Sequence, residues 1–419
     1  MSLMKFELKK ILKAPVTVIA IIAVLLLNLY MLLLGSQDSS YCSSGAYIAP
    51  YQTDIARLQQ EGAYFRGEIN DAWFQKYYAE ADAIRNDPAN HVNEEERERI
   101  RQEDFRGYTA EAISELGSFI YMKESVLRSD EYQKYEDMEF SAHFYERAAQ
   151  TGLVVAADYR ERYPDAKGEA FAAKAEEMYN YMAQDYTAYY NYDLGYHKLR
   201  IMHTTFPLTI GLMILISLSP IFASEYSGKT DALLLTAKHG KRKLIYAKLK
   251  TGILFAILAW MSIELINTLL IFKIYGTAGA EAYWQNWLSE WAPFPWNQLQ
   301  ITLVTVVTSF LGAIFLSGVV MLISAFSKNQ FISLLAGALV LLLPTFRYAF
   351  ANSEIFQMIY CFLPANVLMG IVEWQWFDLA NIFGRIVPLQ VIILATSVLV
   401  AVAGMFVSIF TFRRHQVEN

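Results

Sequence analysis

Long apolar segments constrain the fold of this 419-residue chain more than any other feature. A helix that crosses the roughly 30 Å hydrocarbon core of a bilayer needs about 20 predominantly apolar residues. Six segments meet this requirement: Ala14–Leu34, Thr204–Phe222, Gly252–Phe272, Leu299–Phe326, Phe331–Phe350 and Ile386–Phe410. A seventh stretch, residues 355–372, contains Pro364 and Asn366, which favour a re-entrant or interfacial hairpin. The sequence therefore predicts an all-α, polytopic membrane protein with six transmembrane helices and a re-entrant hairpin before the last.

The distribution of charge separates a water-soluble part of the chain from this membrane part. Residues 36–203 hold 18 Lys or Arg against 31 Asp or Glu, whereas the rest of the chain holds 17 against 10. The whole chain is 55% hydrophobic and 18% charged, which is more apolar than a soluble domain usually is. We therefore expect a separate helical domain over residues 36–198, placed between residues 1–35 with the first span and residues 199–419 with the others.

Apolar residues within this domain recur at helical rather than strand spacing, with turn signals between the periodic segments. The pattern predicts helices over Tyr51–Arg85, Gly107–Arg128, Glu131–Gln150 and Lys167–Tyr196. The last of these is expected to run on into the second span.

Lysine and arginine in the short connections predict the orientation of the spans, because such residues are retained in the cytoplasm. The N-terminal segment has four lysines, the connection 223–251 has seven Lys or Arg, and the opposite connection, Lys273–Gln298, has one. Six crossings of the cell membrane with both termini in the cytoplasm satisfy this asymmetry, and residues 36–198 are then extracellular. Cys42 and Cys361 would both lie outside, where a disulfide is permitted but not indicated by their spacing.

The sequence shows no set of residues for catalysis. Ser227–Thr230 resembles the end of a phosphate-binding loop, but Ala223 occupies the position of the required first glycine and a membrane helix precedes it. The histidines lack metal-ligand spacing, and His197 and His203 are interpreted as an outer boundary feature. We therefore expect a chain that is not an enzyme and that binds no metal, cofactor or nucleic acid.

Polar residues inside the spans are costly and therefore informative. Glu264 and Asn267 are three residues apart and share a helical face with Trp260, so they are expected to line a translocation path or a helix interface. A packed, protonated Glu264 that a neighbouring helix stabilises is the alternative. Asn28 is interpreted as a residue near the end of a span, where snorkelling accommodates it.

Two motifs give the chain a family resemblance. Phe6, Glu7, Leu8, Lys9 and Lys10 precede the first span together with Pro15, and Glu225, Gly228, Leu233, Leu234, Arg242 and Lys248 follow the second span. The first motif resembles the amphipathic helix that leads into the first span of ABC-2 type transporter permeases. The second resembles the cytoplasmic coupling segment of that family. The chain departs from the family's common form in its large insert after the first span, and this insert leaves the cargo open.

The resemblance implies a permease that exports a hydrophobic or amphipathic cargo, such as an antimicrobial peptide, a lipid or a drug. Its implied partners are two cytoplasmic ABC ATPase subunits, which would use ATP and Mg, and a second permease that is either the same chain or a paralogue.

The residues of the coupling loop 223–251 suggest how such a partner would be held. Asp231–Ala237 can form a short helix whose Leu233, Leu234 and Leu235 supply an apolar surface for a groove on a partner. Lysines beside them can also hold the loop to anionic lipid headgroups.

Two other functional classes stay open at this point. One is a sensor or receptor whose extracellular helices bind a ligand and whose basic loop signals to a cytoplasmic protein. The other is a membrane scaffold with an interaction domain. A stoichiometric ATPase partner distinguishes the exporter from both.

Overall fold

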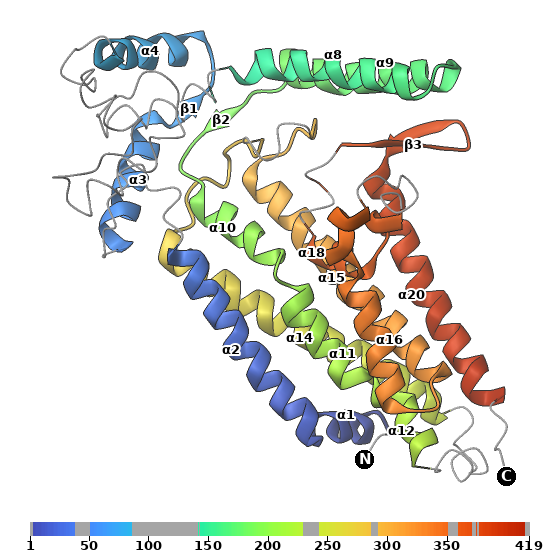
Figure 1. Ribbon diagram of the computed structural model, residues 1–419. Helices are drawn as coiled ribbons and strands as arrows, with labels where there is room; N and C mark the ends of the chain where they lie inside the picture. Colours follow the sequence, from blue (N-terminus) through green and yellow to red (C-terminus); the bar gives the residue numbers. More distant parts are fainter. Residues whose placement is uncertain are drawn as a thin grey trace, which may run out of the picture. The chain divides into compact units, whose positions relative to one another are not determined.

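The computed structural model describes residues 3–37, 51–85, 141, 143–228, 243–285, 292–350, 359–370, 374 and 377–414. The chain divides into two compact units. Unit 1 comprises Met1–Leu33, Gly195–Gly276 and Gln300–Asn419, and unit 2 comprises Leu34–Leu194 and Thr277–Leu299. Unit 1 is a bundle of long helices, and unit 2 is built from shorter helices with one small sheet (Figure 1).

Among the described residues, five helices are long and apolar enough to cross a membrane: Pro15–Leu33, Leu194–Ser227, Ile245–Tyr275, Gln298–Phe326 and Leu389–Phe412. They coincide with five of the six predicted spans, so the mostly helical fold is confirmed and the apolar helices support a membrane protein. The other predicted span, Phe331–Phe350, falls on the shorter α16 (Gln330–Leu342) and the 3₁₀-helix η4 (Leu343–Phe350) that continues it. Six crossings therefore stay a prediction.

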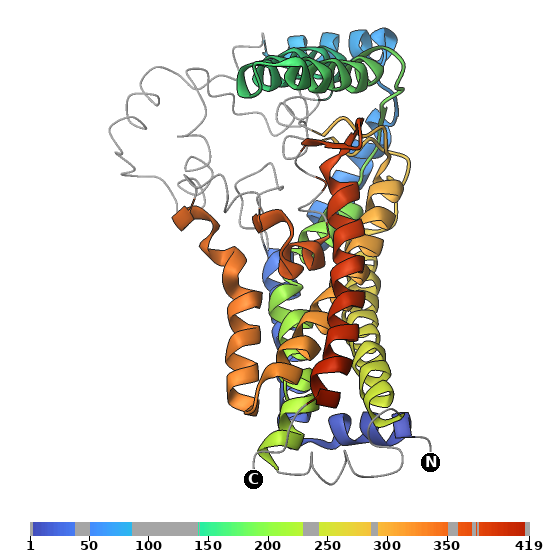
Figure 2. The ribbon, with the colours of Figure 1, turned by 90° about the vertical axis from the view of Figure 1, so that its right-hand side faces the viewer.

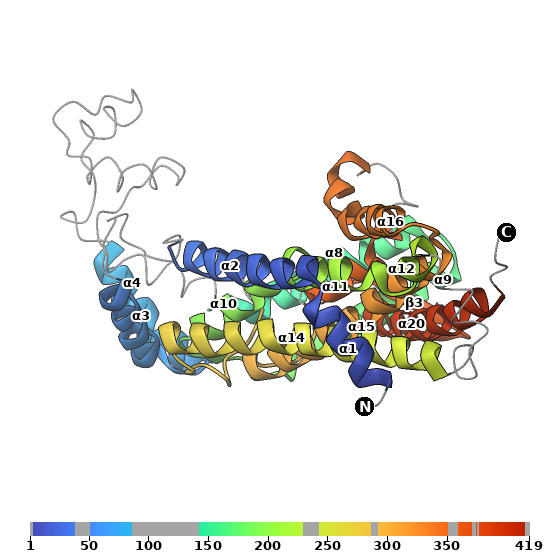
Figure 3. The ribbon, with the colours of Figure 1, turned by 90° about the horizontal axis from the view of Figure 1, so that it is seen from below.

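A break at Pro15 separates α1 (Leu3–Lys13) from α2 (Pro15–Gln37). Proline lacks the backbone N–H that a helix interior requires but fits the first helical position, so a new helix begins there. α1 buries only Glu7 and Ile11, which lie one turn apart, while its four lysines are exposed. Figure 2 shows α1 lying across the end of the bundle where the chain begins and ends, and Figure 3 shows it beside α14 (Ile245–Tyr275).

The second span is not the continuous helix that the sequence predicted. α10 (Leu194–His203) ends in a turn, the π-helix η2 (Pro207–Gly211) follows, and α11 (Leu212–Leu218) leads to α12 (Pro220–Ser227). Each interruption coincides with a proline, which removes one hydrogen bond from the helical ladder. The Gly211 N–H donates to the Phe206 carbonyl, five residues back, as in a π-helix.

α11 and α16 pack against each other in antiparallel orientation, with small residues at the contact. The Ser333 hydroxyl donates to the Ser219 carbonyl over 2.9 Å at one end of this contact. A Cβ on Gly337 would lie 2.4 Å from a Leu215 methyl, and one on Gly211 would lie 2.7 Å from a Leu341 methyl. The absence of side chains at both glycines therefore lets the two helices approach closely.

A short buried helix, α18 (Pro364–Met369), packs against α15 (Gln298–Phe326). A Cβ on Gly312 of α15 would lie 2.4 Å from the Leu368 backbone nitrogen, so only glycine admits this approach. The predicted re-entrant segment 355–372 is described only over residues 359–370. Its path through the membrane stays a prediction.

A β-hairpin that the sequence did not predict precedes the last helix. β3 (Leu379–Ile382) pairs antiparallel with β4 (Arg385–Pro388), and α20 (Leu389–Arg414) follows directly. Phe383 and Gly384 both adopt positive φ in the turn, where the Asn381 side chain accepts from the Gly384 N–H. Ile386 lies in β4, so the last span begins at Leu389, three residues later than predicted.

Unit 2 has its own apolar core, which joins the large insert to a connection far along the sequence. The core contains Phe65, Ile69, Trp73, Phe144, Met182, Ala188 and Tyr283. Tyr283 belongs to the connection between α14 and α15; its backbone N–H donates to Tyr189 O and its hydroxyl lies 2.6 Å from the Ser141 hydroxyl. The insert and this second connection therefore fold together.

Two predicted helices of the insert are shorter than expected. The segment predicted as Tyr51–Arg85 is α3 (Tyr51–Phe65) and α4 (Asp71–Arg85), separated by β1 (Gly67–Glu68). The helix predicted as Lys167–Tyr196 is α9 (Ala166–Gln184), which ends before β2 (Tyr189–Tyr190) and does not run into the second span. β1 and β2 pair antiparallel, and tyrosines favour this extended conformation.

The two other helices predicted in the insert lie wholly or partly outside the described residues. Gly107–Arg128 lies outside the described residues, and Glu131–Gln150 is described only at 141 and from 143 onward. There α8 (Phe144–Arg162) begins and packs against α9 as an antiparallel pair (Figure 1).

Candidate functional site

The site is built at the end of unit 1 where α12 is fixed to the rest of the bundle. The break at Pro220 leaves backbone groups at the start of α12 without helical partners. The Ser324 hydroxyl of α15 accepts from the N–H groups of Phe222 and Ala223, at 3.0 and 3.1 Å, and donates to the Ser219 carbonyl at 2.7 Å. A side chain from another helix thus caps α12 and holds its beginning in place.

Aromatic side chains also hold α12 in place. The Tyr226 hydroxyl donates to the Ala325 carbonyl of α15 over 3.2 Å. The rings of Phe222 and Tyr226 both contact the ring of Phe412 in α20, with centroids 5.3 and 5.5 Å apart. These contacts join α12 to both α15 and α20.

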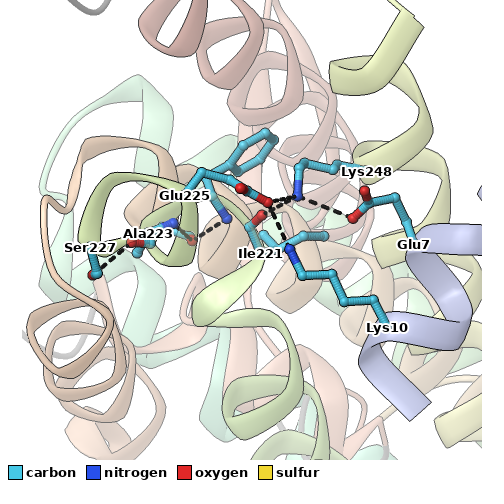
Figure 4. Close-up of polar contacts among 9 residues, drawn as sticks. Glu7, Lys10, Ile221, Ala223, Glu225, Ser227 and Lys248 are labelled. Atoms are coloured by element: carbon cyan, nitrogen blue, oxygen red, sulfur yellow. Dashed lines mark hydrogen bonds and ion pairs between the residues drawn. The ribbon is translucent and has the colours of Figure 1, made fainter. Parts of the chain in front are cut away.

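α12 carries Glu225, which belongs to a cluster of four charged side chains from three helices (Figure 4). The Lys248 ammonium of α14 donates to Glu225 Oε1 at 2.9 Å, to Glu7 Oε2 of α1 at 3.1 Å and to the Ile221 carbonyl at 2.9 Å. An ammonium has three N–H donors, so these contacts can satisfy all of them. Lys10 of α1 adds a second cation, 2.8 Å from Glu225 Oε1. We call Glu7, Lys10, Glu225 and Lys248 the ionic cluster.

The ionic cluster is neutral overall and largely shielded from water. The side chain of Lys248 is 1% exposed, those of Glu7 and Glu225 are 5% and 9% exposed, and that of Lys10 is 49% exposed. Charges removed from water in this way are tolerated only when each has a partner. The cluster therefore holds α1, α12 and α14 together, while the side chain of Lys10 remains accessible to solvent.

The structure brings together residues of the two sequence motifs that lie more than two hundred positions apart. Glu7 and Lys10 from the first motif meet Glu225 from the second, and Lys248 lies between the two carboxylates. Phe6 and Lys9 are exposed on α1 and do not join the cluster. Gly228 ends α12, where its N–H donates to the Ser224 carbonyl. The remaining predicted coupling residues lie outside the described residues: Asp231, Leu233, Leu234, Leu235 and Arg242.

The second predicted group, on α14, reaches three different helices. Trp260 Nε1 donates to Ser309 Oγ of α15 at 3.0 Å. Glu264 Oε2 lies 3.1 Å from His203 Nε2 of α10. Asn267 Oδ1 accepts from Asn28 Nδ2 of α2 at 2.8 Å. All three side chains thus lie at contacts between helices of unit 1.

Sequence reasoning missed the partners in these contacts. Asn28 is 1% exposed and hydrogen-bonded to Asn267, so its interpretation as a snorkelling residue is wrong. His203 is fully buried against Glu264, an arrangement that a boundary position did not suggest. Hydropathy alone could not pair these residues, because each pair joins segments far apart in the sequence. Asn28, a polar residue within an apolar run, nevertheless carried such a signal.

Among the described residues, no group of three or more His, Cys, Asp or Glu side chains is arranged to hold a metal ion. Cys42 lies outside the described residues, so its pairing with Cys361 is not tested.

Comparison with known proteins gives no relative: no family model, curated protein or solved structure matches the chain.

Proposed function

We propose that the chain is the permease subunit of an ATP-driven exporter of the ABC-2 type. Separate ATPase subunits would bind its cytoplasmic face and drive a cargo that is hydrophobic or amphipathic through a path formed with a second permease. The ionic cluster is the observation that carries this proposal, because it joins the two segments that the family resemblance assigns to the ATPase interface.

The distribution of cations supports the orientation that this function requires. Three segments lie together at one end of unit 1: α1, the start of α14 and the turn between α15 and α16. Glu225 of α12 contacts the first two, and Ser219, just before α12, contacts Ser324 and Ser333 on either side of the turn. Lysines collect in these segments: Lys5, Lys9, Lys10, Lys13, Lys243, Lys248, Lys250 and Lys328. Cationic residues near the ends of membrane helices are retained in the cytoplasm. We therefore assign this end to the cytoplasm, and we assign residues 36–198, which follow the first crossing, to the exterior.

The contacts of α12 suggest how motion would pass from an ATPase to the spans. A force on α1 or on the connection before α14 acts on Lys248 through Glu7 and Glu225. α12 in turn is fixed to α15 by Ser324 and to α20 by Phe412. Packed helices of this kind move as rigid bodies rather than deforming continuously. The ionic cluster is thus suited to couple a cytoplasmic motor to reorientation of the bundle.

Purification of the chain from its native membrane, in lipid nanodiscs and with its associated proteins, tests the proposal. We expect a cytoplasmic ATPase in stoichiometric amount, and we expect charged substitutions at Leu233 and Leu234 to remove it. A preparation that contains no ATPase would favour the sensor or the scaffold instead. Ligand binding by unit 2 without ATP-dependent flux would identify the sensor.

A further inference from the structure

A buried histidine and a buried glutamate meet inside the helix bundle, away from the ionic cluster. His203 Nε2 of α10 lies 3.1 Å from Glu264 Oε2 of α14, and their side chains are 0% and 11% exposed. The two atoms are not aligned as a hydrogen bond, and each lacks a hydrogen-bond partner among the described residues. Such a pair of polar atoms in an apolar bundle is costly unless something links them.

The position of one proton on His203 follows from its other nitrogen. Nδ1 lies 2.9 Å from the Leu199 carbonyl oxygen, which can only accept a hydrogen bond. Nδ1 therefore carries a proton, and Nε2 bears a lone pair in the neutral ring. An ionised Glu264 would then place a second lone pair opposite that nitrogen and leave a buried negative charge uncompensated. One additional proton, on either Nε2 or Oε2, removes both penalties.

We propose that His203 and Glu264 form a proton-binding site that controls how α10 packs against α14. With the proton bound, the pair is neutral overall and attractive, either as imidazolium and carboxylate or as imidazole and carboxylic acid. Without it, the carboxylate and the imidazole lone pair repel each other.

In the described part of the chain, no cation lies within ion-pair distance of Glu264 to replace this proton. Among the described residues, no Lys or Arg nitrogen lies within 4.0 Å of the Glu264 carboxylate. Thr268 donates to Oε1 at 3.3 Å, and the Phe206 ring lies 4.4 Å from the His203 ring. α2 and α15 have no charged residue. The other charged or histidine side chains on the two paired helices are His197, Lys198, Arg200, Lys248, Lys250 and Lys273.

The backbone next to His203 provides a hinge that can respond to the proton. His203 is the last residue of α10, and the chain then passes through a turn into the π-helix that begins at Pro207. Helices interrupted in this way bend at the interruption. Loss of the proton therefore pushes α10 away from α14 while α11 keeps its contacts with α16. This inference does not rest on the proposed exporter function.

Nuclear magnetic resonance of the full chain in nanodiscs, labelled with ¹⁵N-histidine, tests the site. His203 is assigned by comparison with His203→Gln, and its signals are followed as the pH is raised. We expect Nδ1 to remain protonated throughout and Nε2 to report the loss of one proton in the wild type. In Glu264→Gln the carboxylate that shares this proton is gone, so the Nε2 signal is expected to show no titration.

Hydrogen exchange of the α10 amides on the same samples gives a second readout. The wild type is expected to exchange faster after the proton is lost, and Glu264→Gln is expected not to change with pH beyond the intrinsic rate. Glu146→Gln is the matched control, because it removes the carboxylate of an exposed pair, His143 and Glu146, that lie 2.9 Å apart. An Nε2 titration in Glu264→Gln that equals the wild-type titration would overturn the proposal, as would α10 exchange that follows only the intrinsic rate in the wild type.

Discussion

Lys248 is the residue on which the ionic cluster depends most. It is 1% exposed and contacts both carboxylates, whereas Lys10 contacts only Glu225. Glu7 therefore has no other cation within ion-pair distance among the described residues. A lysine in the first turn of a membrane helix could be a snorkelling residue, but the burial of Lys248 indicates a structural partner of α1 and α12 instead.

Replacing Lys248 with methionine should destabilise the protein by about 3–5 kcal/mol, because the change leaves the Glu7 charge buried without a partner. Thermal unfolding in nanodiscs measures this loss. Lys250→Met is the control, since Lys250 is exposed two residues further along the same helix. Adding Glu7→Gln to Lys248→Met should recover part of the loss. Equal unfolding temperatures for the Lys248 and Lys250 variants would contradict the role assigned to the cluster.

At the scale of elements, glycines decide which helices approach closely. Gly312 lies against the backbone of α18, whereas a Cβ on Gly404 of α20 would have no neighbour nearer than 3.5 Å. Both glycines lie within long helices, where alanine is intrinsically favoured by about 1 kcal/mol. The difference between the two positions therefore isolates the packing of α18 on α15.

Gly312→Ala should lower stability by about 1–3 kcal/mol, because the added methyl group displaces the α18 backbone. Gly404→Ala should leave stability unchanged or raise it slightly. Unfolding of both variants in the same nanodiscs provides the comparison. Equal stability of the two variants would show that α18 does not pack on α15 as described.

The α8–α9 pair in unit 2 predicts a response to acid. Arg160 Nε lies 2.8 Å from Glu169 Oε2, and this hydrogen bond lowers the pKa of Glu169 below its ordinary value. A carboxylate with a lowered pKa in the folded state stabilises that state at neutral pH, and the contribution is lost as the pH falls through the folded pKa.

Hydrogen exchange of α8 and α9 should therefore accelerate relative to its intrinsic rate as the pH is lowered in the wild type, and less so in Glu169→Gln. Glu177→Gln serves as the control, because Glu177 pairs with Lys174 on its own helix rather than across the pair. An acid response that Glu169→Gln leaves intact would assign the effect to another group.

At the scale of the whole molecule, the apolar runs were sufficient to predict most of the bundle. Five spans coincide with predicted segments because about 20 apolar residues have few alternatives to a membrane helix. The same criterion could not detect the interruption at Pro207, since hydropathy averages over a window and ignores missing backbone donors. It also missed the pairing of β1 with β2, which joins residues more than a hundred positions apart.

The sequence named several residues of the ionic cluster but not the contacts between them. Glu7 and Lys10 belong to the first motif, and Glu225 and Lys248 belong to the second. Nothing in their spacing indicated that Lys248 would lie between the two carboxylates. His203 and Glu264 show the same limit, because contacts between helices depend on how the spans rotate against one another. Charged and polar residues in or beside apolar runs therefore drew attention to these positions, whereas only the fold gives their contacts.

The most direct test of coupling through the ionic cluster is the rate of ATP hydrolysis in nanodiscs that hold the chain and the ATPase proposed above. This rate is compared between wild type and Glu225→Gln. Glutamine retains the size of Glu225 but removes the charge that Lys10 and Lys248 share. If the cluster transmits nucleotide-driven motion, Glu225→Gln should lower the rate of hydrolysis about 5-fold or more, which is the effect that typical coupling free energies produce. Glu177→Gln should leave the rate unchanged. Hydrolysis by Glu225→Gln at the wild-type rate would contradict the proposed coupling.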